Sequence, residues 1–258
     1  MNERLSPTEI VKLTRSDDKL TGREIINTIF PDFFELHGDR AGSDDPAIIG
    51  GLASFDRQPV TVISTDRGQT PAEKVAKRFG SAMPGGYRKA LRLVEQAAKF
   101  QRPVFLFVNT AGAFPSKDAE EEGQGAAIAE NILKIGQAPV PILTVIYGEG
   151  GSGGALALAC GDEVWMLNYS TYSILSPEGF ASIMWKDSSR ADEAAKVMQM
   201  IPEPLLKNKI IEGIISESND HAETCANIQR LLEKRLNFLN QFTGEQLLAR
   251  RRERYRKF

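Results

Sequence analysis

Histidine and cysteine are scarce in this 258-residue chain, which contains two of each. Cys160 and Cys225 do not have the spacing of metal ligands, and Cys160 lies in an apolar run that is typical of a buried free thiol. We therefore expect no metal site in this chain and a reducing, cytoplasmic location. His37 lies in a polar turn, where a capping or surface role is the simpler interpretation.

Long apolar segments and a strong net charge are also missing. The apolar run at residues 138–147 is too short to span a bilayer, and Met1–Arg4 leads into no apolar segment, so we expect no signal peptide. The net charge of −2 gives no electrostatic case for binding a membrane or nucleic acid. The basic end at 250–258 is interpreted as an exposed terminal helix that docks on an acidic surface. What remains is a soluble composition, 41% hydrophobic and 26% charged, enough for one large or two small domains.

Glycine, in contrast, is concentrated in one stretch, where residues 148–154 contain five glycines in seven positions. An apolar run at 140–146 predicts a buried strand before it, and small residues at 155–160 predict a short buried helix after it. Glycines free the backbone to adopt positive φ and to approach a ligand closely. Since the first amides of a helix have no intrahelical partner, this stretch can present N–H groups to a negative charge.

Three functions compete for this stretch. A dinucleotide fingerprint fits Gly148, Gly150 and Gly153, but the next strand ends without the required acid. A nucleophile elbow would use Ser152, with His221 as its base. An oxyanion hole needs only main-chain amides, and we favour it. The residues predicted to form it are Gly150, Gly151, Gly153, Gly154 and Ala155.

Short strands, most of them followed by helices, set the predicted organisation. Strands are expected at 48–55, 59–64, 103–108, 140–146 and 163–167, with short extended segments at 173–175 and 210–215. One long helix is expected at 118–135, another starts near Pro177, and the chain is helical from His221 onward. A second small-residue loop, 109–115, follows the strand at 103–108. This alternation favours a right-handed spiral of ββα units over one flat doubly wound sheet.

Several motifs together resemble the alpha subunits of bacterial acetyl-coenzyme A carboxylase carboxyltransferase. They span roughly residues 34–217 and occur at 34–40, 50–51, 86–92, 121–124, 148–157, 169–173, 176–179 and 181–186. The sequence departs from the family pattern in one site loop, with Ala111 in place of proline, Ser116–Asp118 in place of a glycine-rich segment, and Glu122 in place of arginine. The N-terminal helical extension is also short.

The resemblance implies an α/β fold of the crotonase-like (ClpP/crotonase) type. It divides the chain into an N-terminal helical segment (1–35), a crotonase-like carboxyltransferase domain (36–218) and a C-terminal helical extension (219–258). It also implies transfer of the carboxyl group from carboxybiotin on its carrier protein to acetyl-coenzyme A. The product would be malonyl-coenzyme A, in the first committed step of fatty acid biosynthesis.

The resemblance further implies partners and site residues. The partners are a beta subunit in an α2β2 assembly, which carries the family's zinc ribbon, together with the biotin carboxyl carrier protein and a separate ATP-using biotin carboxylase. The expected substrate-binding residues are Gly112, Ala113, Phe114, Ser152, Ser176, Pro177, Glu178 and Gly179. We expect the glycine-rich amides to serve the biotin side and the partner to serve the thioester, with no protein base.

Two alternative functions remain open on the sequence. A serine hydrolase would pair Ser152 with His221 and Asp187 or Asp192. A non-catalytic scaffold subunit would account for the departures at Ala111 and Glu122.

Overall fold

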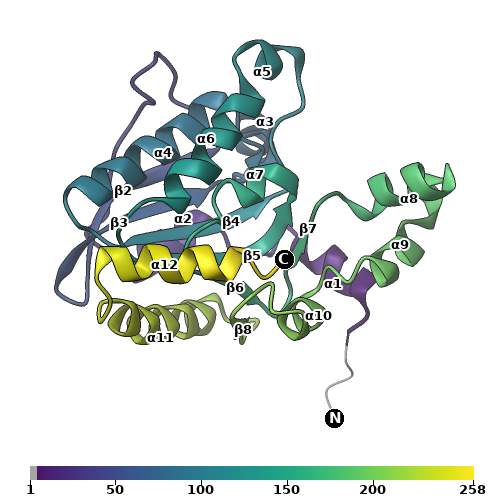
Figure 1. The fold of residues 1–258 in the computed structure, drawn as a ribbon. Helices are drawn as coiled ribbons and strands as arrows, with labels where there is room; N and C mark the ends of the chain where they lie inside the picture. The colour runs from purple at the N-terminus through teal and green to yellow at the C-terminus, as the bar shows by residue number, and fades with distance from the viewer. Residues whose placement is uncertain (1–4) are drawn as a thin grey trace.

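The chain folds around one mixed β-sheet with helices on both of its faces (Figure 1). The computed structural model describes residues 5–258, and the prediction that Met1–Arg4 begins no signal peptide lies outside them. Among the described residues, no helix combines the length and the apolar composition needed to cross a bilayer.

The sheet is antiparallel at one edge and parallel elsewhere. Its strands are β1 (Phe34–Glu35), β2 (Ile48–Phe55), β3 (Gln58–Thr65), β4 (Val104–Thr110), β5 (Ile142–Gly151), β6 (Glu163–Leu167), β7 (Thr171–Ser173) and β8 (Gly213–Ile215). Their order is β1-β2-β3-β4-β5-β6-β8, and β7 pairs with β5. Every residue of β4 is buried, as its continuous apolar sequence predicts.

One edge of β5 changes its partner along the strand. It pairs with β6 as far as Ile146, which lies opposite Met166, and with β7 from Glu149, which lies opposite Thr171. The other edge pairs with β4 as far as Gly150. The last residues of β5 are therefore held between β4 and β7, at the end of the sheet where the small-residue loops lie.

Twelve α-helices surround the sheet in the described residues, and several of them begin at side-chain caps. They are α1 (Pro7–Thr14), α2 (Gly22–Ile29), α3 (Pro71–Ala76), α4 (Pro84–Lys99), α5 (Lys117–Glu121), α6 (Gln124–Gly136), α7 (Ser152–Leu156), α8 (Pro177–Trp185), α9 (Ala191–Val197), α10 (Pro202–Lys207), α11 (His221–Leu239) and α12 (Gly244–Tyr255). Ser6, Thr21 and Thr243 each form a capping box with a Glu or Gln three residues later, which pairs otherwise unbonded amides.

Two hydrophobic clusters lie on opposite faces of the sheet. Alternate residues of β4 point to opposite faces, so Leu106 joins the cluster under α4, α6 and α7, and Phe105 joins the cluster under α2 and α11. The second cluster contains Ile25 from the N-terminal helices and Leu232 from the C-terminal helices. Both ends of the chain thus pack into the same core.

Several local predictions of element bounds were wrong. The continuous helix expected from His221 onward is interrupted between Leu239 and Gly244, where α11 ends and α12 begins. The single helix expected at 118–135 is broken into α5 and α6 by Gly123, whose φ of 87° is left-handed. The short strand expected at 173–175 lies instead at Thr171–Ser173, because β5 offers its free edge there. The strand before the glycines does not end at 146 but continues to Gly151.

The α8–α9 arm, residues 177–197, extends away from the sheet (Figure 1). It contains α8, a short 3₁₀ helix (Ser188–Arg190) and α9. Within it, the rings of Phe180 and Trp185 meet edge to face, and the Arg190 guanidinium lies 4.1 Å from the centre of the Trp185 ring. Helix α1 lies between the arm and the sheet and contacts α9, β5 and β7.

Candidate functional site

The glycine-rich stretch is half strand and half helix. Its first four residues complete β5, and α7 begins at Ser152. None of the five glycines uses the positive φ that glycine permits, whereas Ser152 itself has a φ of 56°. Gly148, Gly151 and Gly154 are required for close packing instead. A Cβ on Gly151 would lie 2.1 Å from the Ala111 carbonyl oxygen, closer than any side chain allows.

The second small-residue loop packs directly on the start of α7. A Cβ on Gly154 would lie 2.4 Å from the Ala113 amide nitrogen and 2.5 Å from the Tyr87 hydroxyl. Gly112 has a φ of 135°, and its N–H donates to Thr110 Oγ1 at 3.1 Å. The Gln124 side chain donates to the Phe114 carbonyl at 3.2 Å. The two loops therefore pack against each other as one unit.

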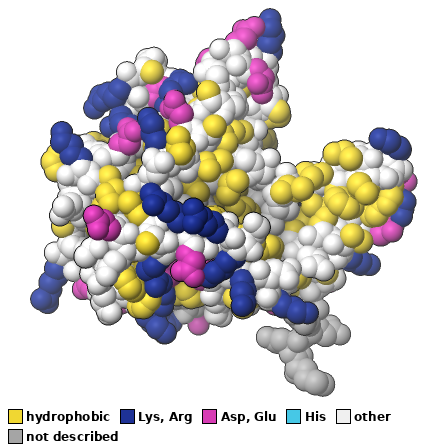
Figure 2. Space-filling view, in the orientation of Figure 1, with side chains coloured by type: hydrophobic (Ala, Val, Ile, Leu, Met, Phe, Trp, Pro, Cys, Tyr) yellow, Lys and Arg dark blue, Asp and Glu magenta, His cyan; other side chains and the backbone are white. Residues whose placement is uncertain are grey.

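An apolar groove lies above this unit, where α7, β7 and α10 meet. Its volume is about 400 Å³, and its lining is formed by Ser152, Gly153, Leu156, Tyr172, Ser173, Ile174, Leu205 and Ile210. Figure 2 shows hydrophobic side chains on both sides of the hollow between the body of the molecule and the arm. Desolvation raises the pKa of Tyr172 to about 12, so the phenol in this groove stays protonated at neutral pH.

The predicted oxyanion residues lie at different depths. Gly153 lines the groove, whereas Gly154 and Ala155 are buried below it. Gly150 and Gly151 lie in the strand, opposite β7 residues. Within the described chain, no side chain caps the first turn of α7, so its first amides are available to another acceptor.

The other predicted substrate-binding residues form two groups. Gly112, Ala113 and Phe114 lie in the loop that supports α7, while Ser152 lines the groove. A second group, Ser176–Gly179, forms the start of α8, outside the groove lining. There Ser176 caps the helix by accepting the Gly179 amide at 3.1 Å, and Glu178 pairs with Arg15 at 2.7 Å.

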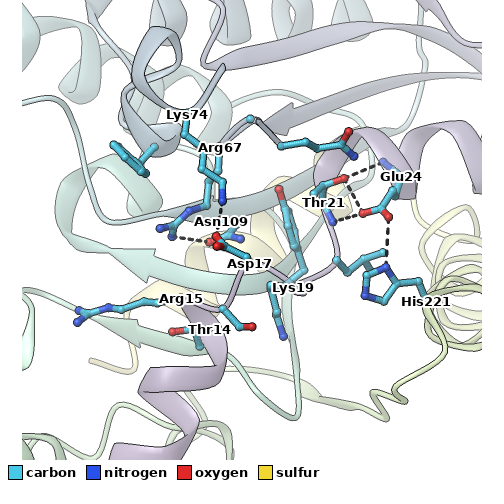
Figure 3. A pocket seen from close by; sticks show the side chains of 16 residues that line it. Thr14, Arg15, Asp17, Lys19, Thr21, Glu24, Arg67, Lys74, Asn109 and His221 are labelled. Carbon is cyan, nitrogen blue, oxygen red and sulfur yellow. Dashed lines mark hydrogen bonds and ion pairs between the residues drawn. The ribbon is translucent and has the colours of Figure 1, made fainter. Parts of the chain in front are cut away.

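The serine hydrolase alternative is excluded because His221 is not placed to act as a base for Ser152. Both ring nitrogens of His221 are engaged, Nδ1 with Glu24 Oε1 at 3.2 Å and Nε2 with the Asp18 carbonyl at 2.9 Å. His221 lines a different cavity from the groove that contains Ser152 (Figure 3). Asp187 accepts from the Ser189 amide at 3.0 Å, so it is already used as a cap in the arm. These groups do not form a triad.

The structure also contains a polar cavity of about 340 Å³ that the sequence did not predict (Figure 3). Two of its lining residues bind Glu149, which accepts from Arg15 Nε at 2.8 Å and from Arg67 Nη1 at 2.6 Å. Asn109 Oδ1 accepts the Glu149 amide at 2.9 Å and Arg67 Nη1 at 3.2 Å. The only signal in the sequence was that Glu149 is the one charged residue in the glycine-rich stretch. Across the described part of the chain, no group of three or more His, Cys, Asp or Glu residues could hold a metal ion.

The fold is shared with large acyl-coenzyme A carboxylating enzymes. A transcarboxylase 12S structure, solved with methylmalonyl-coenzyme A and methylmalonic acid bound, matches 90% of this chain with a TM-score of 0.70 and 20% identity. The beta subunit of geranyl-CoA carboxylase from P. aeruginosa matches 94% with a TM-score of 0.69 and 17% identity. The chain spans 45% and 46% of those chains, less than half of each. The fold is the predicted crotonase-like α/β spiral.

Sequence comparison identifies the chain more narrowly as a carboxyltransferase. A family model described as "Acetyl co-enzyme A carboxylase carboxyltransferase-like" matches residues 1–258. The acetyl-coenzyme A carboxylase carboxyl transferase subunit alpha of Streptococcus sanguinis is 48% identical over 97% of this chain and 98% of its own length. The subunit of the same name from Streptococcus pyogenes is 49% identical over the same shares. The chain belongs to the acetyl co-enzyme A carboxylase carboxyltransferase family, and its place there is that of the alpha subunit.

Proposed function

We propose that this chain performs the biotin-side half of carboxyl transfer from carboxybiotin to acetyl-coenzyme A, which forms malonyl-coenzyme A. The observation that carries the proposal is the position of Gly153, in the first turn of α7, at the floor of an apolar groove. Gly112 and Ala113 support that turn from below. We place this activity in the cytoplasm, where the two buried free cysteines would remain reduced.

The chemistry needs donors for a transient anion. Carboxybiotin on its carrier protein would supply the carboxyl group, and its transfer leaves negative charge on the ureido oxygen. The first amides of α7 lack intrahelical partners and can donate to that oxygen. The apolar walls formed by Leu156, Ile174 and Leu205 lower the local dielectric constant, which strengthens such hydrogen bonds. Tyr172 stays protonated, so it offers no base.

The proposal requires a second polypeptide for the thioester side. The chain covers less than half of the carboxylating enzymes that share its fold, so a beta subunit would supply the other half. The arm exposes Ile183, Met184 and Val197, each more than half accessible to solvent. Apolar side chains so exposed are typical of a protein interface. We propose an α2β2 assembly served by the biotin carboxyl carrier protein and a biotin carboxylase.

Substitutions at Gly153 in the reconstituted enzyme test this assignment. A Cβ at Gly153 meets only Ile128, at 3.6 Å, so Gly153→Ala should fold and keep most of the activity. The branched side chain of Gly153→Val would stand between the amides and the substrate, and malonyl-coenzyme A formation should fall on the order of a hundredfold, as when an oxyanion donor is lost.

Ser152→Ala is the matched test of the hydrolase alternative. It should leave the rate of carboxyl transfer nearly unchanged, because the proposed mechanism uses no serine nucleophile. Full activity of Gly153→Val would overturn the assignment of this turn. A wild-type chain that forms no malonyl-coenzyme A with its beta subunit would favour a scaffold role.

A further inference from the structure

Arg15 joins three parts of the chain that are distant in sequence. It follows α1, and its guanidinium donates from Nε to Glu149 on β5 at 2.8 Å and from Nη1 to Glu178 at the start of α8 at 2.7 Å. A planar guanidinium fixes the direction of both partners, so this bridge sets geometry as well as charge. Its two partners lie on the site strand and on the arm.

The strand side of the bridge is rigid without Arg15. Glu149 is only 8% exposed, and its other oxygen accepts from Arg67 at 2.6 Å. Its amide is held by Asn109 at 2.9 Å. Removal of the Arg15 guanidinium would therefore leave the buried carboxylate paired, and the strand should keep its place.

The arm side of the bridge is more weakly attached. The Glu178 side chain is 46% exposed. Two other contacts join this region to the N-terminal segment. Val11 packs on Ala195 and Met200, and the Thr8 hydroxyl donates to the Asp192 carbonyl at 3.5 Å. Figure 1 shows α1 as the element that separates the arm from the sheet. Since ion pairs this exposed contribute little to global stability, loss of the bridge should loosen the arm without unfolding the molecule.

The arm's position decides the shape of the hollow beside the groove. Ile174, which is 80% exposed, lies on the body side, and Ile183, which is 63% exposed, lies on the arm. Figure 2 shows apolar side chains facing the hollow from both sides. A partner that binds across this hollow must contact both surfaces, so its affinity depends on a fixed distance between them.

We propose that Arg15 is a positioning residue, which holds the α8–α9 arm at a fixed angle to the glycine-rich strand by bridging Glu149 and Glu178, and so prepares the hollow for the partner subunit. This inference rests on the proposed function for the identity of that partner. The N-terminal segment is then a strap that orders the docking surface, although no atom of Arg15 lines the groove.

Hydrogen exchange of the full chain without its partner gives the first test. In Arg15→Met, amide exchange in residues 177–197 should rise about tenfold or more, while β4 and β5 exchange as in the wild type. Arg15→Lys, which keeps the charge, should recover part of the protection. Arg23→Met is the matched control, because Arg23 pairs with Glu35 at 3.2 Å, away from the arm. Unchanged exchange in the arm of Arg15→Met would overturn the inference.

Glu178→Gln provides an independent variant, since it cuts only the arm half of the bridge and leaves Arg15 bound to Glu149. It should loosen the same residues. In the reconstituted enzyme, Arg15→Met should bind the beta subunit about tenfold more weakly and keep most of its rate at saturating partner. A loose arm with unchanged affinity would contradict the docking role. Wild type that transfers no carboxyl group would overturn the proposed function instead, because the exchange result does not depend on it.

Discussion

Most glycines of the 148–154 stretch allow close packing of the backbone. Neighbouring glycines that look equivalent in the sequence therefore have different roles. Gly151 and Gly154 approach the backbone of Ala111 and Ala113, where a Cβ has no room. Gly153 faces the groove, where a Cβ has space. The abundance of glycine could be read from the sequence, but its purpose could not, because the loop it packs against lies about forty residues earlier in the chain.

Alanine substitutions at the two adjacent glycines should therefore differ. Gly154→Ala places a Cβ within 2.4 Å of the Ala113 nitrogen, so the 110–114 loop must move or α7 must shift. We expect a loss of about 1–3 kcal/mol in the free energy of unfolding, as for overpacking elsewhere. Gly153→Ala should change it by less than about 0.5 kcal/mol, or stabilise the helix slightly. Urea unfolding of both variants measures this, and equal stabilities would contradict the packing assignment.

Glu149 shows where sequence reasoning stops at the residue scale. Its charge within a glycine-rich stretch was visible, but its partners, Arg15, Arg67 and Asn109, come from three other segments. No local pattern connects them. A pairing of this kind follows only from the sheet topology, which brings the end of β5 beside the ends of α1 and β3.

At the scale of single elements, local signals predicted most beginnings and fewer ends. The proline at position 177 starts a helix as expected, whereas the helix start at Thr243 was missed, because the segment from His221 onward was expected to be helical throughout. The break at Gly123 was missed because the acidic and apolar pattern continues across it. β7 was misplaced because its register is set by the edge of β5 and not by its own three residues.

The C-terminal helix is held by a buried ion pair that its basic composition concealed. Arg251 donates to both oxygens of Asp162, at 3.0 and 2.7 Å, and to the carbonyls of Ile135, Ala138 and Val140. Its side chain is 1% exposed. The basic tail was predicted to be an exposed helix that docks on an acidic surface. Arg251 does pair with an acidic residue, but it is buried and not exposed.

Arg251→Met should destabilise the whole molecule. It would leave the Asp162 carboxylate buried without its cation, which typically costs about 3–5 kcal/mol. For a chain of this size that corresponds to a melting temperature lower by roughly 10 °C. Arg252→Met, one residue further along and exposed, removes the same charge and should melt like the wild type. Thermal unfolding followed by circular dichroism measures the melting temperature of each variant. Equal melting temperatures would show that the buried ion pair does not anchor α12.

At the scale of the whole molecule, the order of strands and helices predicted an α/β spiral, and the combined motifs predicted the family. Both are confirmed. The groove and the arm could not be predicted, because they depend on how α1, β7, α8 and α10 meet in space. The division into 1–35, 36–218 and 219–258 stays a prediction, as do the individual oxyanion donors.

The proposed function depends most on one interaction, in which a main-chain amide in the first turn of α7 stabilises the transient anion. Replacing the peptide bond before Gly153 by an ester, through incorporation of glycolic acid at that position, removes one N–H and leaves every side chain unchanged. The same exchange at Gly125 is a close control, because Gly125 is likewise the second residue of a helix, α6, and is exposed.

The measurement is the rate of malonyl-coenzyme A formation by each ester-containing chain with its beta subunit. The account predicts a fall on the order of a hundredfold for the ester at position 153 and a nearly unchanged rate for the ester at position 125. Equal, undiminished rates for both would contradict it.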